Sequence, residues 1–393
     1  MSESATQAAE LPKEEVQQRL EITSSPQFHD AASTPRIMWS VTACLIPASA
    51  WGVYVFGWYA LAVLLVSTAA AVLTEAVIAR VMNRRTLFDG SAVLTGLLIG
   101  MNMPPEIPFH VPIVASVFAI AVVKWTFGGL GNNWMNPALA GRVFVFFSWT
   151  GEMTTWKMPL TLPVADGTSG ATILGAVKSG VVQTGNDIGL PTSYLSRIDY
   201  PRSGVDASVT SWLNDNVLEG LGISLPNGYV DPLLGNIPGC IGEVSALLLM
   251  LGAVYLFAKK IITWEIPTAY FLSFAVLTWV FGGTVYGTGF FTGDVLLHIL
   301  AGGFMLGLFY MATDMVTSPM TTRGMLIYGA GAGLLTFLIR FYGSFPEGVS
   351  LAIILMNIFT PIINRYTRPA IYGRKQTETA RTETARAEAA QES

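Results

Sequence analysis

Charge, cysteine and histidine are all scarce in this sequence of 393 residues. Charged residues make up 12% of it, about half of the ~25% that is usual for a soluble domain. With two cysteines, Cys44 and Cys240, and three histidines, the chain alone cannot build a four-cysteine iron–sulfur or zinc site. We therefore expect no metal site. The net charge of −4 argues against a basic face for nucleic acid.

Apolar residues are abundant instead. They make up 52% of the chain, and the mean hydropathy is +0.51. So little charge could not cover the surface of a soluble protein of this length. The sequence therefore predicts an all-α polytopic membrane protein with about ten transmembrane helices. The predicted spans are residues 37–57, 58–82, 90–103, 111–129, 137–149, 241–258, 266–283, 294–312, 324–342 and 348–364.

Two of these runs, 90–103 and 137–149, are too short to cross a bilayer unaided, because a spanning helix needs roughly 20 apolar residues. Both adjoin glycine, proline and asparagine. Broken or re-entrant helices are therefore expected at these positions, since irregular backbone is tolerated at membrane depth only inside protein or along a cavity.

Lysine and arginine follow the even-numbered spans, which places both termini in the cytoplasm by the positive-inside rule. The predicted organisation is a polar tail (1–36), a membrane half (37–149), an extracytoplasmic loop (150–240), a second membrane half (241–366) and a disordered tail (367–393). The loop carries eight acidic and four basic residues, as a translocated loop can.

The two membrane halves resemble each other. Residues 88–112 match 298–324, and residues 128–149 match 341–363, as glycine-rich helices that break at polar or proline segments. Five spans in each half would give the two copies opposite orientations. Inverted repeats with broken helices place binding sites near the midplane in transporters, and a passive channel of the urea-channel kind would have the same layout.

The loop contains the run Asp-Gly-Thr-Ser-Gly-Ala-Thr at residues 166–172. Small residues around a threonine are by themselves typical of a turn. As a pattern, however, the run resembles the site at which a flavin transferase attaches FMN to threonine through a phosphoester. The Thr172 hydroxyl would form the bond, and Gly170 and Ala171 would leave it unshielded. Asp166 and Ser169 would be read by the transferase or would order the loop. Neither histidine nor lysine adjoins Thr172, so self-modification is not implied.

The likeness extends well beyond this motif. Together with it, residues 133–142, 234–245, 312–319 and 346–350 resemble the D-subunit family of the Rnf complex, the ion-translocating ferredoxin–NAD oxidoreductase. The similarity covers roughly residues 36–373 in our comparison of patterns. The B subunit of the sodium-pumping NADH–quinone reductase is a close relative of that family and remains an alternative.

The resemblance implies a membrane protein that relays electrons between ferredoxin and NAD, coupled to Na⁺ or H⁺ translocation. It implies covalent FMN on Thr172 and a second, non-covalent flavin, riboflavin or FMN, within the membrane part. The polar residues at the predicted helix breaks are the candidate ligands of that second flavin: Thr95, Asn133, Asn136, Thr313, Asp314 and Ser318. Capping of the helix that starts at Pro137 is an equally good explanation of the two asparagines.

The same resemblance implies which proteins this chain assembles with. No Gly-x-Gly-x-x-Gly fingerprint follows a predicted strand, so NAD and the iron–sulfur centres are assigned to other subunits. The expected partners are the A, B, C, E and G subunits of the Rnf complex, a flavin transferase and the lipid bilayer of the inner or plasma membrane. The chain would thus be part of a translocating oxidoreductase without a complete active site of its own.

Ionisable residues inside predicted spans are functional candidates by default. Glu75 and Lys124 lie near span ends, where their side chains could extend to the interface. Glu243 would start a helix, where an acid favours the helix dipole. We favour Asp314 as an ion or flavin ligand, and expect no disulfide between Cys44 and Cys240. The further candidates in the spans are Arg142, Asp294, His298 and Arg340.

Overall fold

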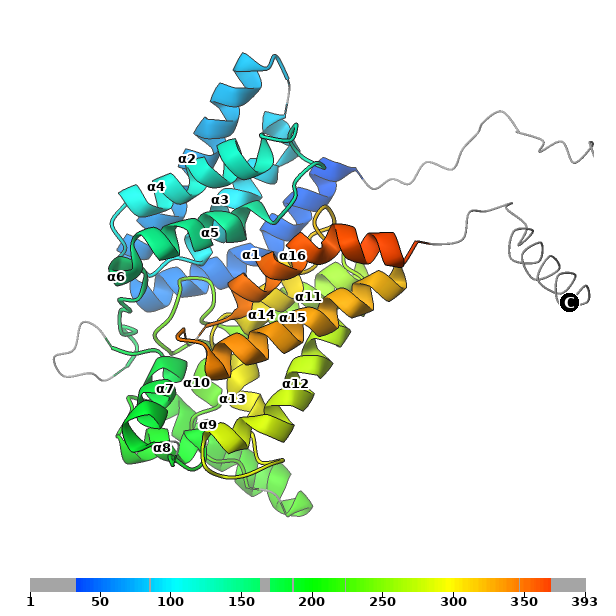
Figure 1. Cartoon of the computed structure of the whole chain (residues 1–393). Coiled ribbons are helices and arrows are strands. Elements are labelled where there is room, and N and C mark those ends of the chain that lie inside the picture. Colours follow the sequence, from blue (N-terminus) through cyan, green and yellow to red (C-terminus); the bar gives the residue numbers. More distant parts are fainter. Residues whose placement is uncertain are drawn as a thin grey trace, which may run out of the picture. The chain divides into compact units, whose positions relative to one another are not determined.

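The computed structural model describes residues 33–368, apart from Arg85, 163–169, Asn186, Ile223 and Pro346. Every regular element in this part of the chain is a helix, as the composition predicts (Figure 1). The predicted tails 1–36 and 367–393 lie almost entirely outside the described residues, so they stay predictions.

Five helices of the described part are long and apolar enough to cross a membrane. They have 18 to 24 residues, or about 27–36 Å at 1.5 Å per residue, which matches a hydrocarbon core of about 30 Å. Each coincides with a predicted span to within three residues. These helices are α1 (Thr34–Phe56), α2 (Trp58–Val81), α12 (Glu265–Val285), α15 (Thr322–Tyr342) and α16 (Val349–Tyr366).

Shorter helices cover four more of the predicted spans. The two segments expected to be short form α3 (Ser91–Met101) and α5 (Pro137–Ser148), and the segment 241–258 forms α11 (Ala246–Ala258). The segment 111–129 forms α4 (His110–Val117), which continues as the π-helical η2 (Phe118–Lys124). Since none of these reaches 18 residues, the full set of ten crossings stays a prediction.

The segment 294–312, predicted as one span, is broken. It forms α13 (Val295–Leu300), the short α14 (Phe304–Leu306) and the π-helical η5 (Gly307–Met311). The break lies at Gly302 and Gly303, whose φ angles are +69° and +66°. Glycine adopts this left-handed conformation without the steric cost that other residues carry, so the Gly-Gly pair ends the helix.

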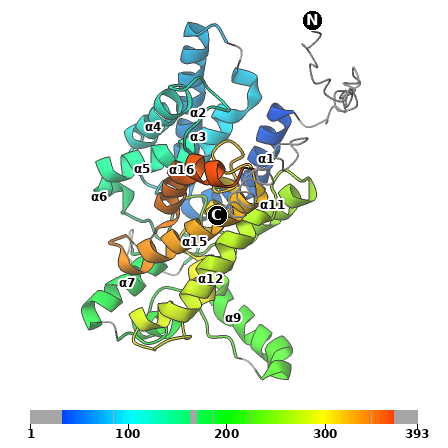
Figure 2. The same cartoon turned by 45° about the vertical axis from the view of Figure 1, so that its right-hand side comes forward.

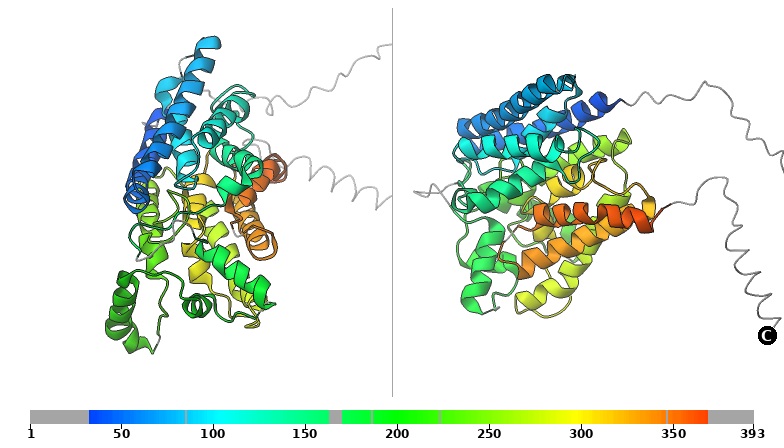
Figure 3. Two further views of the ribbon diagram at one scale, coloured as in Figure 1. Left: turned by 90° about the vertical axis from the view of Figure 1, so that its left-hand side faces the viewer. Right: turned by 45° about the horizontal axis from the view of Figure 1, so that its top comes forward.

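The order of elements recurs in the two halves. Two helices (α1 and α2, then α11 and α12) precede a short or broken one, which is followed by two further helices (α4–η2 and α5, then α15 and α16). Figure 2 shows α12 beside α15, and the right panel of Figure 3 shows the long helices running alongside one another. This recurrence agrees with the predicted repeat, whose inversion remains a prediction.

The segment between the halves, treated above as a loop, is largely helical. Its helices gather at one end of the bundle, near α13 and the C-terminal end of α12 (Figures 1 and 2). The carboxylate of Asp206 is fully buried there and accepts hydrogen bonds from the backbone N–H groups of Gly228, Val230 and Asp231. The elements are α6 (Thr150–Met153), α7 (Ile173–Thr184), α8 (Pro191–Arg197), α9 (Gly204–Leu213), η3 (Asn214–Leu218), η4 (Glu219–Leu221) and α10 (Val230–Leu234).

Candidate functional site

Thr172 is the N-cap residue of α7. Its backbone is extended (φ −61°, ψ 159°), and its Oγ1 accepts a hydrogen bond from the backbone N–H of Gly175 at 3.1 Å. Threonine is a preferred N-cap because its oxygen satisfies one of the free amides of the first turn. The hydroxyl therefore lies at the positive end of a 12-residue helix, where a phosphate group is electrostatically favoured.

The small residues before Thr172 make hydrogen bonds and pack closely against neighbouring residues. Gly170 donates its N–H to the carbonyl of Trp156 at 3.0 Å, and a Cβ on Gly170 would lie 2.6 Å from Sδ of Met158. The carbonyl of Ala171 accepts a hydrogen bond from the hydroxyl of Tyr200 at 2.8 Å. A side chain at position 170 would therefore require the Met158 side chain to move. Asp166 and Ser169, the other predicted motif residues, lie outside the described residues.

A cavity of about 360 Å³ opens beside Thr172, near the lower end of the range of roughly 300–1,000 Å³ typical of small-molecule sites. We call it the Thr172 cavity. Aromatic rings form much of its wall, and such rings can stack on a planar ligand. Phe146 and Phe345 contact each other edge-on, with ring centroids 4.9 Å apart. The lining comprises Phe146, Thr154, Trp156, Gly170, Ala171, Thr172, Gly175, Ser179, Phe345 and Glu347.

Arg142 on α5 forms a buried charge cluster next to this cavity. Its Nη2 lies 2.8 Å from Oε2 of Glu347 and 3.5 Å from Oε1 of Glu243. The guanidinium also contacts Sγ of Cys240 and donates to the hydroxyl of Ser350. The expectation that Glu243 starts a helix is wrong, because α11 begins at Ala246 and Ser245 is its cap. Glu243 serves instead as a partner of Arg142. Both cysteines are free, as expected.

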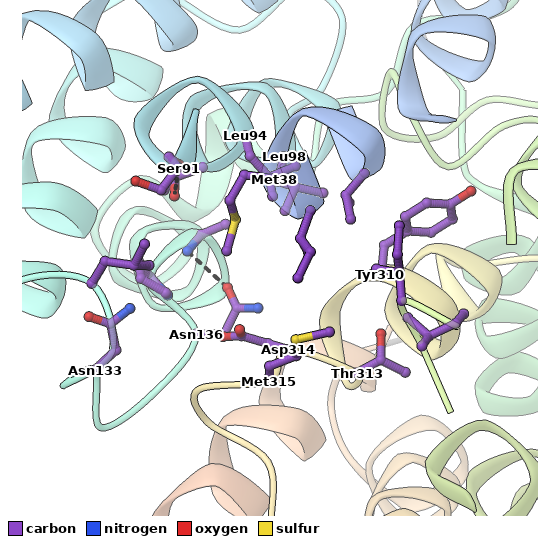
Figure 4. A pocket seen from close by; sticks show the side chains of 18 of the residues that line it. Met38, Ser91, Leu94, Leu98, Asn133, Asn136, Tyr310, Thr313, Asp314 and Met315 are labelled. Carbon is purple, nitrogen blue, oxygen red and sulfur yellow. Dashed lines mark hydrogen bonds between the residues drawn. The ribbon is translucent and has the colours of Figure 1, made fainter. Parts of the chain in front are cut away.

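A second cavity, the broken-helix cavity, lies where α1, α3, α5 and η5 meet (Figure 4). Its volume is about 90 Å³. Five of the six polar residues predicted from the helix breaks line it, although they come from segments far apart in the sequence. These are Thr95, Asn133, Asn136, Thr313 and Asp314. Ser318, the sixth, is buried but does not belong to this wall.

The two asparagines of the broken-helix cavity differ in the hydrogen bonding of their side-chain oxygens. Asn136 caps α5, as the alternative explanation requires: its Oδ1 accepts from the N–H groups of Ala138 and Leu139 at 3.0 and 3.3 Å. Oδ1 of Asn133 is buried without a hydrogen-bond partner in the described part of the chain. Because an unsatisfied buried polar atom is costly, Asn133 is the side chain of this wall that most needs a ligand.

Lys124 also lines the broken-helix cavity, and the expectation that it extends to the membrane interface is wrong. Its Nζ lies 2.9 Å from Oε2 of Glu75, and the two side chains are 1% and 0% exposed. Lys124 also donates to the hydroxyl of Ser91, and Trp125 Nε1 donates to the same Glu75 oxygen at 2.8 Å. Sequence reasoning treated the charges singly. Their opposite signs within apolar runs were the signal for a pair, since a buried charge requires a partner.

Two further predicted polar residues, Asp314 and Asp294, also have hydrogen-bond partners. Asp314 accepts from the N–H of Val316 at 3.3 Å and from the hydroxyl of Thr317 at 3.1 Å. Asp294 caps α13 through the N–H of Leu297 and accepts from the hydroxyl of Tyr229. Both carboxylates are therefore held by local structure, so an ion-binding role for Asp314 stays a prediction.

Comparison with known proteins gives the family. The model of the NQR2, RnfD, RnfE family matches residues 21–373. The chain belongs to this family. A Clostridium ljungdahlii relative, named as the D subunit of a proton-translocating ferredoxin:NAD(+) oxidoreductase complex, is 41% identical over 90% of this chain and 96% of its own length. An Acetobacterium woodii relative, named as the D subunit of the Na(+)-translocating complex, is 40% identical over 90% and 95%.

A more distant member of the NQR2, RnfD, RnfE family is similar over nearly the same span. The Stutzerimonas stutzeri protein, named as the D subunit of an ion-translocating oxidoreductase complex, is 36% identical over 87% of this chain and 93% of its own length. The family match covers both membrane halves and the helical segment between them. The resemblance inferred from the motifs is therefore confirmed at the level of the family.

Proposed function

We propose that this chain is the D subunit of a membrane-bound, ion-translocating ferredoxin:NAD oxidoreductase and that it carries electrons through FMN esterified to Thr172. One observation carries the flavin assignment: the last threonine of the attachment motif caps the 12-residue α7 at the wall of an aromatic cavity. The names of the relatives support the complex, since all three are named as D subunits of an oxidoreductase complex.

The residues around Thr172 fit an attached phosphate. In the attachment reaction, the Thr172 oxygen would form a bond to the phosphorus of the flavin half of FAD. The pyrophosphate bond would break, AMP would leave, and the transferase would take up the hydroxyl proton. The N–H of Gly175, which now donates to Oγ1, and the free amides of the first turn of α7 would then hold the phosphoester.

The Thr172 cavity suits the rest of that group. Its aromatic residues Phe146, Trp156 and Phe345 offer faces and edges to a planar ring system, and Thr154 and Ser179 offer hydroxyl groups. Bound FMN supplies one- and two-electron chemistry that no amino-acid side chain has. This chain's part is to hold the ring in position and to limit its contact with water.

The broken-helix cavity is our proposed site for the second, non-covalent flavin, riboflavin or FMN. The cavity as it stands holds about 90 Å³, below the roughly 300–1,000 Å³ typical of small-molecule sites, so a flavin would enter it by displacing lining side chains. Oδ1 of Asn133 lacks a partner in the described part of the chain. A flavin ring carries an imide N–H that can donate a hydrogen bond to this oxygen. Thr95, Thr313 and Asp314 bring further polar atoms to the same wall.

The partners follow from what the chain lacks. With two cysteines it cannot hold a four-cysteine cluster, so the iron–sulfur chemistry would belong to other subunits. The resemblance to the Rnf complex implies that these, and the site for NAD, are among its A, B, C, E and G subunits. A flavin transferase is required for maturation. The transported ion is Na⁺ or H⁺: relatives at 41% and 40% identity are named for the proton and for Na⁺, respectively.

The B subunit of a quinone reductase is the second candidate, because the matching family model includes NQR2. Turnover of the purified complex separates the two assignments. Ferredoxin-dependent NAD reduction supports the Rnf assignment, and quinone reduction by NADH without ferredoxin supports the quinone-reductase assignment.

Covalent flavin is tested by co-expressing the chain with a flavin transferase, denaturing it in SDS and imaging flavin fluorescence in the gel. The matched variants are Thr172→Ala and Thr172→Asn. Asparagine keeps an N-cap acceptor for α7 but has no hydroxyl to esterify. We expect a fluorescent wild-type band and two dark variants. A dark wild-type band, with the transferase active on a control substrate, would exclude FMN here and favour a passive channel.

A further inference from the structure

A third cavity, the Lys178 cavity, lies at the C-terminal ends of the neighbouring helices α12 and α15. Its volume is about 300 Å³, and it is separate from the Thr172 cavity, because the two use different faces of α7. Its lining combines cationic and aromatic side chains with apolar ones: Leu174, Val177, Lys178, Val181, Val182, Val285, Tyr286, His298, Arg340, Phe341, Tyr342 and Gly343.

Two cations in this wall donate their hydrogen bonds to carbonyl groups, and the Arg340 guanidinium also lies over the ring of Phe274, 5.2 Å from its centroid. Nζ of Lys178 donates to the carbonyl oxygens of Arg340, Phe345 and Gly343. Arg340 donates to those of His298 and Gly302. None of the ion pairs between described residues includes Lys178 or Arg340.

The other buried cations of the bundle differ in this respect. Lys124 is paired with Glu75, and Arg142 with Glu243 and Glu347. Burial and the neighbouring Arg340 guanidinium lower the pKa of the Lys178 ammonium, which is the expected response of a cation that lacks a counter-charge. An anion in the Lys178 cavity would supply that charge.

Two polar atoms of the same wall lack partners. Nε of Arg340 and Nδ1 of His298 are both buried without a hydrogen bond in the described part of the chain, and their residues are 4% and 2% exposed. Nε2 of His298 shares a hydrogen bond with the hydroxyl of Tyr286 at 2.6 Å. When Tyr286 donates, Nδ1 of His298 carries the proton. Two N–H donors of these wall residues are then unused, although both atoms are buried, and such donors suit the oxygens of an anion.

The depth of the Lys178 cavity indicates where the anion comes from. Helices α12 and α15 each have 21 residues, about 31 Å at 1.5 Å per residue, so their ends reach the headgroup level of a bilayer. The rim is apolar and open, with Val182 and Tyr342 78% and 63% exposed. Phosphate groups of lipids lie at this depth, next to acyl chains that can contact such a rim.

We propose that the Lys178 cavity binds an anionic phospholipid, with the headgroup phosphate held by Lys178, Arg340 and His298 and the acyl chains along α12 and α15. Binding is non-covalent. It would fix α7 against the membrane helices, because Lys178 belongs to α7 whereas Arg340 and His298 belong to α15 and α13. This inference does not depend on flavin at Thr172.

The test uses the full chain in its complex, purified in detergent and stripped of lipid. Thermal unfolding is followed while dioctanoyl phosphatidylglycerol, dioctanoyl phosphatidylcholine or inorganic phosphate is added. Ligands that bind only the folded state raise the melting temperature in a saturable manner. We expect phosphatidylglycerol to do so, with at least tenfold weaker responses to the other two probes.

Two variants and one control assign the site. Lys178→Met keeps the aliphatic stem on the half-buried face of α7 and should weaken phosphatidylglycerol binding tenfold or more, as should Arg340→Gln. If Arg340→Gln does not fold, Lys178→Met alone decides. Lys259→Met is the control, since Lys259 is exposed, follows α11 and does not line the cavity.

Three outcomes would overturn the proposal. An equal response to phosphatidylcholine would show that anionic charge is not recognised, and an equal response to inorganic phosphate would show that the lipid is not the ligand. Unchanged phosphatidylglycerol binding in Lys178→Met would place the lipid elsewhere.

Discussion

Nη2 of Arg142 lies 2.8 Å from Oε2 of Glu347 and so joins α5 of the first membrane half to the segment before α16 of the second. Glu243, at 3.5 Å, adds a second acid to the same guanidinium. Glu347 lines the Thr172 cavity as well. The wall of the proposed FMN site is thus held in place by an ion pair between the two halves.

Replacing Arg142 should destabilise the chain strongly. Arg142→Met leaves two carboxylates in a buried site without a cation, and breaking a buried pair in this way costs about 3–5 kcal/mol. Thermal unfolding of the purified chain measures the loss. The double variant Arg142→Met/Glu347→Leu should recover part of it, because one of the unpaired charges is then gone. Equal melting temperatures of wild type and Arg142→Met would contradict the assignment of the pair.

The Glu75–Lys124 pair gives a second test. Either Glu75→Leu or Lys124→Met leaves one charge unpaired in the first half and should cost about 3–5 kcal/mol. The double variant should cost clearly less than the sum, which a double-mutant cycle of unfolding free energies detects. Additive losses would mean that the two side chains do not interact.

The broken-helix cavity predicts selective effects on riboflavin binding. Asn133→Ala removes the unpartnered Oδ1, and Leu98→Trp fills space in the lining, so both should weaken binding tenfold or more. Quenching of riboflavin fluorescence by the purified chain measures it. Ser318→Ala is the matched control, because Ser318 was a predicted ligand that does not line the cavity. If Ser318→Ala has the larger effect, the site is wrongly placed.

Gly96 tests the packing of α3 on α2. A Cβ on Gly96 would lie 2.6 Å from Cα of Thr68 and 2.9 Å from the carbonyl oxygen of Ser67, so Gly96→Ala must push two helices apart. Overpacking of this kind typically costs about 1–3 kcal/mol. Gly220→Ala is the control, since a Cβ there has no neighbour within 4 Å. Unfolding midpoints that fall equally in both variants would argue against this helix contact.

The sequence was most informative where a property is local. Hydropathy located the five long helices, because a spanning helix must be apolar along most of its length. The motif located Thr172, and the helix breaks located Thr95, Asn133 and Asp314, since glycine, proline and polar residues interrupt a helix wherever it lies. That these breaks share one cavity agrees with the idea that irregular backbone at membrane depth lines a cavity.

The sequence by itself thus determined the membrane class and the extent of the long helices of this protein, and it singled out the motif at residues 166–172 on which the FMN proposal rests. Only the tertiary structure decided which charges are partners: Lys124 with Glu75, 49 positions away, and Arg142 with Glu347, whereas Lys178 and Arg340 donate to carbonyl groups and pair with no carboxylate of the described residues. The physical reason is that hydropathy and helix breaking act along the chain. Ion pairing and cavity formation instead depend on which helices become neighbours, and this is set by packing of the whole bundle.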